Sequence, residues 1–260
     1  MLLVASTADS DKINKELIIN MGSRLVTKEK TGFTLAEVLI TLGIIGIVAA
    51  LTIPTLIVNY QQHETVTKLQ RAISVINQAY RLSFDDVGEP NSAFEVGNEE
   101  YFKTYWQPYI KVLTYCTSFQ VCGYATKYPF SYIDGNNVNA AVYDSKSRTS
   151  FLTADGFFYI IYVANYGKDD DGNLKLQPFP WVLVDINGGA KPNRAGRDVF
   201  LLTRVDSEKD GGGVQPLGYQ LTNVQIDANC TKDANTRSKG QFCAEKIRRA
   251  GWKINKDYPW

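Results

Sequence analysis

One carboxylate, Glu37, stands directly in front of a long apolar stretch, and it is the residue with the clearest chemical task in the chain. Residues 38–58 form a run of 21 residues without a charged side chain. An ionised group in lipid costs about 2.5–3.5 kcal/mol at mid-helix and less near a helix end. Glu37 therefore needs a partner, and we expect none from the side chains of its own helix start.

The four cysteines fall into two local pairs, Cys116 with Cys122 and Cys230 with Cys243. Outside the cytoplasm this spacing indicates two small disulfide loops, one of three connectivities that four cysteines allow. Closing a loop of about a dozen residues stabilises a fold by roughly 3 kcal/mol in the chain-entropy model. A four-cysteine zinc site is the alternative, but the chain lacks the close Cys-x-x-Cys pairs typical of such sites.

Two stretches concentrate the hard oxygen ligands that calcium prefers in sets of six to eight. The tighter one offers Asp169, Asp171 and Asn173, with Asp170 between them. The looser one contains the following residues: Asp185, Asn187, Asn193 and Asp198. Neither stretch has the fixed glycine and glutamate of an EF-hand, and the same residue types are common in exposed turns. Calcium is thus the one cofactor that the sequence suggests, with an ordinary turn as the alternative.

Residues for enzymatic catalysis are scarce. The single histidine, His63, follows the apolar stretch, so a Ser-His-Asp or Cys-His site on a globular domain is not available. The adjacent Glu99 and Glu100 are typical of a solvated helix start, and no phosphate-binding glycine loop is present. We expect no enzyme, and a hydrolase based on carboxylates is the remaining alternative.

The apolar stretch predicts a long helix. As a helix, residues 38–58 cover about 32 Å, enough for a bilayer core of about 30 Å. Apolar residues then continue at intervals of three and four along one stripe: Val66, Leu69, Ile73, Ile76 and Tyr80. We predict one helix from Phe33 to about Ser83, which Pro54 should bend and in which Gly43 and Gly46 allow close helix approach.

The rest of the chain predicts a smaller helix and then strands. Residues 99–113 carry Phe102, Trp106 and Ile110 at helical spacing, which favours core packing over a ligand-stacking platform. Strands are expected at residues 140–143, 149–153, 156–165, 181–186 and 198–203, with Asp155-Gly156 as a tight hairpin turn. A short helix is expected at residues 240–250. Neighbouring strands without intervening helices indicate an antiparallel sheet, so the predicted fold class is α+β, with the long helix packed on that sheet.

The residues around Glu37 resemble the N-terminal segment of type IV pilins and of the pseudopilins of type II secretion. The motif residues are Gly32, Phe33, Thr34, Leu35 and Glu37, followed by a proline within the apolar helix, here Pro54. The resemblance covers about 27 residues, and it implies a pilin-like architecture for the predicted α+β fold. It also implies a family precedent for calcium, since major pseudopilins carry a calcium site in a late loop.

The resemblance also implies a processing and assembly chemistry. A prepilin peptidase would cleave between Gly32 and Phe33 and methylate the new amine of Phe33, and Glu37 would then pair with the amino terminus of a neighbouring subunit. Such a pair removes an unpaired charge from lipid and fixes the register of the subunits. The alternative is an ordinary signal anchor. A secretory signal, however, would place its cleavage site after the apolar stretch, not before it.

The flanking charges predict the topology. Arg24, Lys28 and Lys30 precede the apolar stretch, so the N-terminus should be cytoplasmic and the globular part periplasmic, with a single pass through the inner membrane before filament assembly. We divide the chain into a leader at residues 1–32, a transmembrane helix half at 33–58 and a periplasmic domain at 59–260. Because a leader of 32 residues is long for this family, Met21 is the expected start.

Charge and size bound the function. Without residues 1–32 the chain has 23 basic and 23 acidic residues, so no nucleic-acid partner is expected. The sequence predicts a subunit of a type IV pilus or a type II secretion filament. Its partners would be prepilin peptidase, other pilin or pseudopilin subunits, the inner-membrane assembly platform and the membrane. The size and the two loops favour a minor subunit. The alternative is a membrane-anchored or filament-tip binding module for adhesion or DNA uptake.

Overall fold

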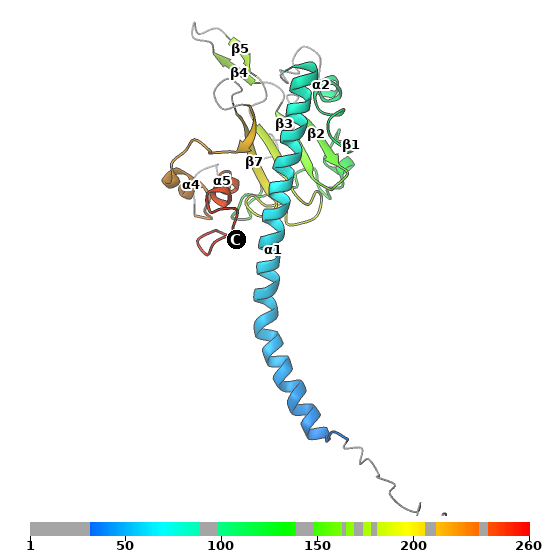
Figure 1. Cartoon of the computed structure of the whole chain (residues 1–260), viewed down its shortest axis with the longest axis vertical. Helices are drawn as coiled ribbons and strands as arrows, with labels where there is room; N and C mark the ends of the chain where they lie inside the picture. Colours follow the sequence, from blue (N-terminus) through cyan, green and yellow to red (C-terminus); the bar gives the residue numbers. More distant parts are fainter. Residues whose placement is uncertain are drawn as a thin grey trace, which may run out of the picture. The chain divides into compact units, whose positions relative to one another are not determined.

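The computed structural model describes residues 32–88, 98–138, 148–162, 165–168, 174–177, 181–205, 212–233 and 239–260. The chain forms two compact units, residues 1–53 and residues 54–260. Helix α1 (Leu35–Val87) begins in the first unit and ends in the second (Figure 1). All strands and the shorter helices belong to the second unit.

Helix α1 continues one turn beyond the predicted end near Ser83. Asp85 and Asp86, which follow the predicted end, still lie within it. The helix stops at Gly88, which has a φ of +88° and whose N–H donates to the carbonyl of Phe84 at 3.1 Å. Glycine adopts this left-handed conformation without the steric penalty of other residues, so the end of the helix is set by Gly88.

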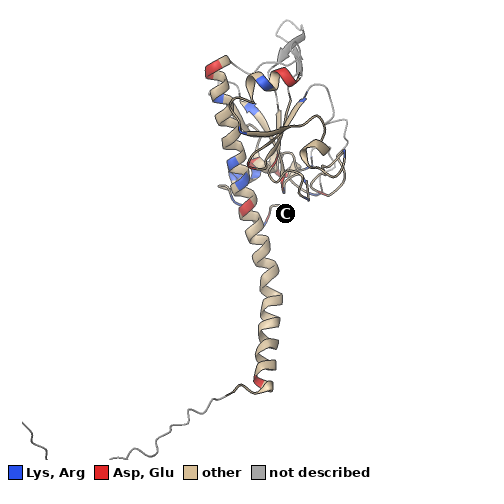
Figure 2. Cartoon of the chain, turned by 90° about the vertical axis from the view of Figure 1, so that its right-hand side faces the viewer, with Lys and Arg blue, Asp and Glu red and all other residues tan. Residues whose placement is uncertain are grey.

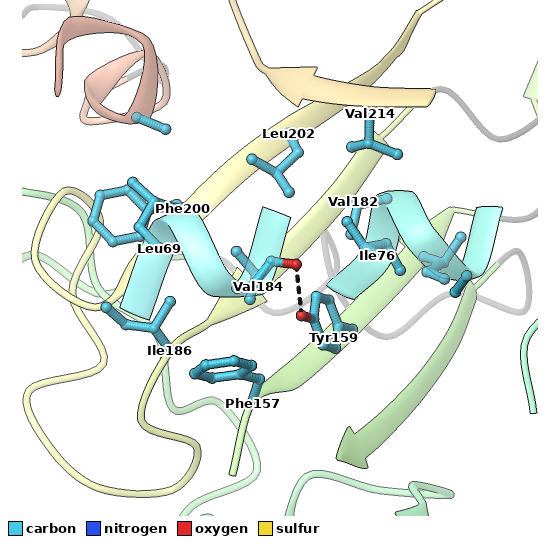
Figure 3. Close-up of a cluster of buried hydrophobic side chains, with 14 of the residues drawn as sticks. Leu69, Ile76, Phe157, Tyr159, Val182, Val184, Ile186, Phe200, Leu202 and Val214 are labelled. Atoms are coloured by element: carbon cyan, nitrogen blue, oxygen red, sulfur yellow. Dashed lines mark hydrogen bonds between the residues drawn. The ribbon is translucent and has the colours of Figure 1, made fainter. Parts of the chain in front are cut away.

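The second half of α1 packs on the sheet through its predicted apolar stripe. Leu69 and Ile76 are fully buried, together with two small residues on the same face, Ala72 and Ala79. The small side chains let the helix backbone lie close to the sheet. The hydroxyl of Tyr159 in the sheet therefore reaches the carbonyl of Ala72 and donates to it at 2.9 Å (Figure 3). The main core therefore lies between α1 and one face of the sheet.

The sheet has six strands in the order β1-β2-β3-β6-β7-β8, and every neighbouring pair is antiparallel. The strands have these bounds: β1 Val112–Tyr115, β2 Arg148–Thr153, β3 Phe158–Tyr162, β6 Trp181–Asp185, β7 Val199–Val205 and β8 Gly213–Pro216. Strands β4 (Asn165–Lys168) and β5 (Leu174–Gln177) form a separate two-stranded sheet. The predicted α+β class, a long helix on an antiparallel sheet, is confirmed.

Several predicted strands need correction. The hairpin turn at Asp155-Gly156 is confirmed between β2 and β3. The single strand expected at residues 156–165 is instead β3, and Asn165 starts β4. Strands β1, β5 and β8 have no counterpart in the prediction, and the strand expected at residues 140–143 lies outside the described residues.

The helix predicted at residues 99–113 is also shorter than expected. Helix α2 (Asn98–Tyr105) stops before Pro108, and the chain enters β1 at Val112. Proline has no N–H for the helix ladder and disfavours helical geometry in the residue before it. Trp106 and Ile110 are nevertheless buried in the main core, so their predicted packing role is confirmed although the helix ends earlier.

The opposite face of the sheet carries a second, smaller core. Phe158 and Ile160 of β3 point to this side, whereas the alternating Tyr159 and Ile161 belong to the main core. The second core is covered by the segment with the short 3₁₀ helix η1 (Gln120–Cys122). Helices α4 (Asn223–Asn229) and α5 (Cys243–Arg249) complete the fold, and α5 lies within the range predicted at 240–250.

Candidate functional site

The start of α1 gives Glu37 a partner that we did not expect from the sequence. The carboxylate oxygen Oε2 of Glu37 accepts hydrogen bonds from the main-chain N–H and the hydroxyl of Thr34, both at 2.8 Å. The Thr34 hydroxyl oxygen in turn accepts the N–H of Glu37 at 3.2 Å. This reciprocal arrangement is a capping box, whose signal Thr-x-x-Glu is present in the sequence. The expectation that no side chain of the helix start can pair with Glu37 was wrong.

The residues at the predicted cleavage point are open to their surroundings. Gly32 precedes the helix, and the side chain of Phe33 is 86% exposed. No atom lies within 4 Å of the point where a Cβ on Gly32 would stand. No described part of this chain therefore covers the bond between Gly32 and Phe33, and a peptidase can reach it.

The segment after Glu37 fits a membrane. Among the described residues, α1 is the one helix that is long and apolar enough to cross a bilayer. Its large apolar side chains are exposed within the chain, and those of Ile44, Ile47 and Leu51 are more than half exposed. Figure 2 shows no charged residue between the acidic residue at the start of α1 and the charged residues of its second half. An apolar surface of this kind requires lipid or other helices around it.

Pro54 and the two glycines lie in this helix as predicted. Pro54 is inside α1, where it lacks the N–H that would bond the carbonyl of Ala50. Gly43 and Gly46 have no atom of this chain within 4 Å of an added Cβ. Nothing in the described chain therefore requires small residues at these two positions.

The cysteines form the two predicted local disulfides. Cys116 is bonded to Cys122 with their Cα atoms 5.6 Å apart, and Cys230 to Cys243 with Cα atoms 4.9 Å apart. The first closes the segment of η1 over the second core, and the second ties α4 to α5. No cysteine is free, so the four-cysteine zinc site was the wrong alternative.

The tighter group of candidate calcium ligands, Asp169, Asp171 and Asn173, lies outside the described residues, as does Asp170. Calcium binding there stays a prediction. Within the described ranges, no group of three or more His, Cys, Asp or Glu side chains is arranged to hold a metal ion.

The looser group lies in the loop between β6 and β7, and its oxygens are occupied by the loop itself. Asp198 accepts hydrogen bonds from the main-chain N–H groups of Asn193 at 2.8 Å and Arg194 at 2.5 Å, and from the side chain of Asn187 at 3.2 Å. The buried Asn193 amide, with its NH₂ toward the oxygens, donates to Asp185 and to two loop carbonyls. These carboxylates therefore organise a turn, and the donors that surround them do not fit a cation.

Burial dominates the electrostatics of this loop. Loss of solvent raises the pKa of Asp185 well above its ordinary value, and the nearby charge of Asp198 raises it further. Burial also raises the pKa of Asp198, opposed by the N–H groups of Arg194 and Asn193. Tyr124 donates to Asp185 at 2.9 Å from the second core, which links the loop to that side of the sheet.

The other titratable candidates are ordinary surface groups. Glu99 pairs with Lys103 across one helical turn at 2.9 Å, as expected for a solvated helix start. His63 is an exposed residue of α1. Among the described residues, neither belongs to a group of three or more His, Cys, Asp or Glu side chains that could hold a metal ion.

The comparisons with known proteins agree with this geometry. Residues 27–53 match the prokaryotic N-terminal methylation motif, so the helix start and the fold define a pilin-type or pseudopilin subunit that is processed by prepilin peptidase and anchored in the inner membrane. Residues 55–260 match the model of a family of unknown function (DUF6613), and the chain belongs to that family. No curated protein and no solved structure matches the chain.

Proposed function

We propose that this protein is a minor subunit of a type IV pilus or of a type II secretion filament. One observation carries the proposal: Gly32 and Phe33 stand exposed before a capped helix whose first half is apolar and uncharged. Cleavage before Phe33 would create an amine next to that helix, and the amine would pair with Glu37 of a neighbouring subunit in the filament.

During assembly, the Glu37 carboxylate would exchange its hydrogen-bond partners. In the single chain, Glu37 is held by two donors of Thr34, both neutral. A cationic amine offers a stronger, charge-assisted hydrogen bond, particularly in the low dielectric of a helix bundle. The exposed Gly43 and Gly46 would let neighbouring helices approach closely enough for that contact.

Mass spectrometry of the mature amino terminus tests the processing step. We expect the mature chain to begin with N-methylated Phe33, after removal of the cytoplasmic leader. We also expect residues 59–260 to be accessible to a protease that is added from the periplasmic side. A mature chain that begins elsewhere would contradict the proposal.

A variant tests the assembly step. Glu37→Ala should be cleaved normally but incorporated poorly into filaments, because the pairing carboxylate is gone. Glu64→Ala is the matched control, since Glu64 is a carboxylate of the same helix beyond the apolar stretch and pairs with Lys68 at 2.9 Å. Equal incorporation of both variants would count against the pairing.

The second candidate function is a binding module for adhesion or DNA uptake. The location of the mature chain in membranes and purified filaments tests it. A chain that is processed and anchored but absent from purified filaments, or present at their tips alone, would favour it. The proposed calcium site is separate from both functions: calorimetry without heat on calcium addition, and an unchanged melting temperature, would remove it.

A further inference from the structure

The loop between β6 and β7 meets the last residue of the chain beside α1. The two segments line a small cavity of about 180 Å³ together with Gln61, Glu64, Thr65 and Lys68 of α1. The hydroxyl of Thr65 donates to the carbonyl of Arg197 at 3.2 Å, which fixes the loop against the helix. Both views of the chain place its end next to α1 (Figures 1 and 2).

This part of the second unit lies just beyond the end of the uncharged stretch. Gln61 and Thr65 follow Val58 by three and seven residues, which corresponds to about 4.5 and 10 Å along a helix. The headgroup layer of a bilayer is about 5–8 Å thick on each side of the hydrocarbon core. Long side chains at the level of Thr65 therefore reach this layer when residues 38–58 span the membrane.

The side chains at this level are of the kind that headgroups attract. The guanidinium of Arg197 lies over the ring of Trp260, 4.5 Å from its centroid, and Lys191 is exposed on the same loop. Neither cation makes an ion pair with a described carboxylate, whereas Lys68 is paired with Glu64. Tryptophan and basic residues are enriched at membrane interfaces, where one side is apolar and the other is wet and anionic.

We propose that Lys191, Arg197 and Trp260 form a surface that binds the headgroups of anionic phospholipids where α1 leaves the membrane. We name it the Arg197 surface. It rests on the anchoring of α1 but not on the kind of filament that the subunit joins. Anionic lipid bound there would hold the globular unit against the bilayer before assembly, and extraction into a filament would have to break these contacts.

Quenching by brominated lipid tests the Arg197 surface in the anchored chain. The mature chain, beginning at Phe33, is reconstituted into phosphatidylcholine vesicles that contain a minor fraction of phosphatidylglycerol. Bromine is placed either on the phosphatidylglycerol or on an equal amount of phosphatidylcholine. Anionic lipid should be enriched about fivefold near each basic residue. Brominated phosphatidylglycerol should therefore quench tryptophan fluorescence more strongly than brominated phosphatidylcholine.

Three variants identify the source of that difference. Trp260→Phe should abolish it, because the other three tryptophans lie away from this level. Trp106 is buried in the core, and Trp181 begins β6 at the end of the strand opposite the loop. Trp252 lines a cavity with Arg81 and Leu82 near the end of α1. Lys191→Gln and Arg197→Gln should each reduce it severalfold, with the melting temperature unchanged. Lys103→Gln is the control, because it removes an exposed cation from α2.

The outcomes separate this inference from the proposed function. A chain that does not float with vesicles in high salt overturns both, because the anchor has failed. A chain that floats but shows equal quenching by the two lipids, or a difference that survives in Trp260→Phe, overturns the Arg197 surface alone.

Discussion

The side-chain amide of Asn77 pairs with both main-chain polar groups of Val214. Its NH₂ donates to the Val214 carbonyl at 2.8 Å, and its oxygen accepts the Val214 N–H at 2.7 Å. Val214 belongs to β8, the last strand at one edge of the sheet. At this point the side chain of Asn77 makes the hydrogen bonds that a further strand would make. The main-chain polar groups of Val214 at the sheet edge are thus paired and are not open to pairing with another chain.

We predict that Asn77→Ala lowers the free energy of unfolding by about 1–3 kcal/mol, because two buried main-chain groups lose their partner. Asn77→Asp should lower it as well, since a carboxylate keeps the bond from the Val214 N–H but repels the carbonyl. Urea unfolding of the globular unit measures the effect. Gln78→Ala, at the exposed neighbouring position, is the control and should change the free energy by less than about 0.5 kcal/mol. Equal effects of Asn77→Ala and Gln78→Ala would contradict the edge role.

The Asn77 contact also shows where sequence reasoning stops. The apolar stripe of α1 predicted the buried face, because helical periodicity is local. Asn77 lies next to that stripe as an ordinary polar residue, and its partner is 137 residues away. Only the order of the strands makes β8 an edge, and no local pattern in the sequence gives that order. The short strand β8 itself was missed for the same reason.

For the candidate site the outcome was different, because its signals are local. The motif Gly32, Phe33, Glu37 and the uncharged stretch could be read directly, and the family match covers the motif and the stretch as far as residue 53. The partner of Glu37 was missed although Thr34 stands three residues before it. The Thr-x-x-Glu capping signal was present, but the donors that Thr34 supplies are neutral groups and not a charge opposite to the carboxylate.

The two disulfides should contribute similar amounts to stability. Their sequence separations are 6 and 13 residues, for which chain entropy gives about 2.4 and 3 kcal/mol. We expect the double variant Cys230→Ala/Cys243→Ala to lose slightly more than Cys116→Ala/Cys122→Ala. Denaturant unfolding in oxidising buffer compares them, and reduction of the parent should lower its stability by at least the larger of the two losses. If the unfolding midpoint of the parent protein did not change on addition of reductant, the predicted contribution of the disulfides would be contradicted.

The loop between β6 and β7 should respond to pH. Burial and the charge of Asp198 raise the pKa of Asp185 in the folded protein above its unfolded value. The folded state then binds the proton more tightly, so the stability contributed by Asp185 is present below about pH 4 and is lost as the pH rises. Relative to the parent, Asp185→Asn should therefore become more stable as the pH increases, which denaturant unfolding at several pH values measures.

Asp257→Asn is the control, because its stability relative to the parent should change with pH in the opposite direction. Lys246 donates a hydrogen bond to Asp257 and lowers its pKa, so its contribution is present above the unfolded pKa and is lost as the pH falls. This variant should lose stability relative to the parent as the pH increases. If Asp185→Asn followed the same trend as Asp257→Asn, the pKa of Asp185 would not be raised by burial.

The capping box at the start of α1 should govern how that helix begins in the unassembled subunit. In Thr34→Val the hydroxyl is lost, so the Glu37 N–H loses its acceptor and the carboxylate loses one of its two donors. Loss of an N-cap costs about 1 kcal/mol, which corresponds to about fivefold faster hydrogen exchange of the first helical amides. Exchange measured by mass spectrometry on the mature chain in detergent micelles should show this increase near Glu37 and no change beyond Pro54.

Thr34→Ser is the matched variant, since serine keeps the hydroxyl and should restore slow exchange. Cleavage before Phe33 should proceed in both variants, because the bond lies outside the helix. Fast exchange in Thr34→Ser, or unchanged exchange in Thr34→Val, would show that the carboxylate of Glu37 is held by some other group. That result would also weaken the proposed exchange of partners during assembly, in which the amine of a neighbouring subunit displaces the donors of Thr34.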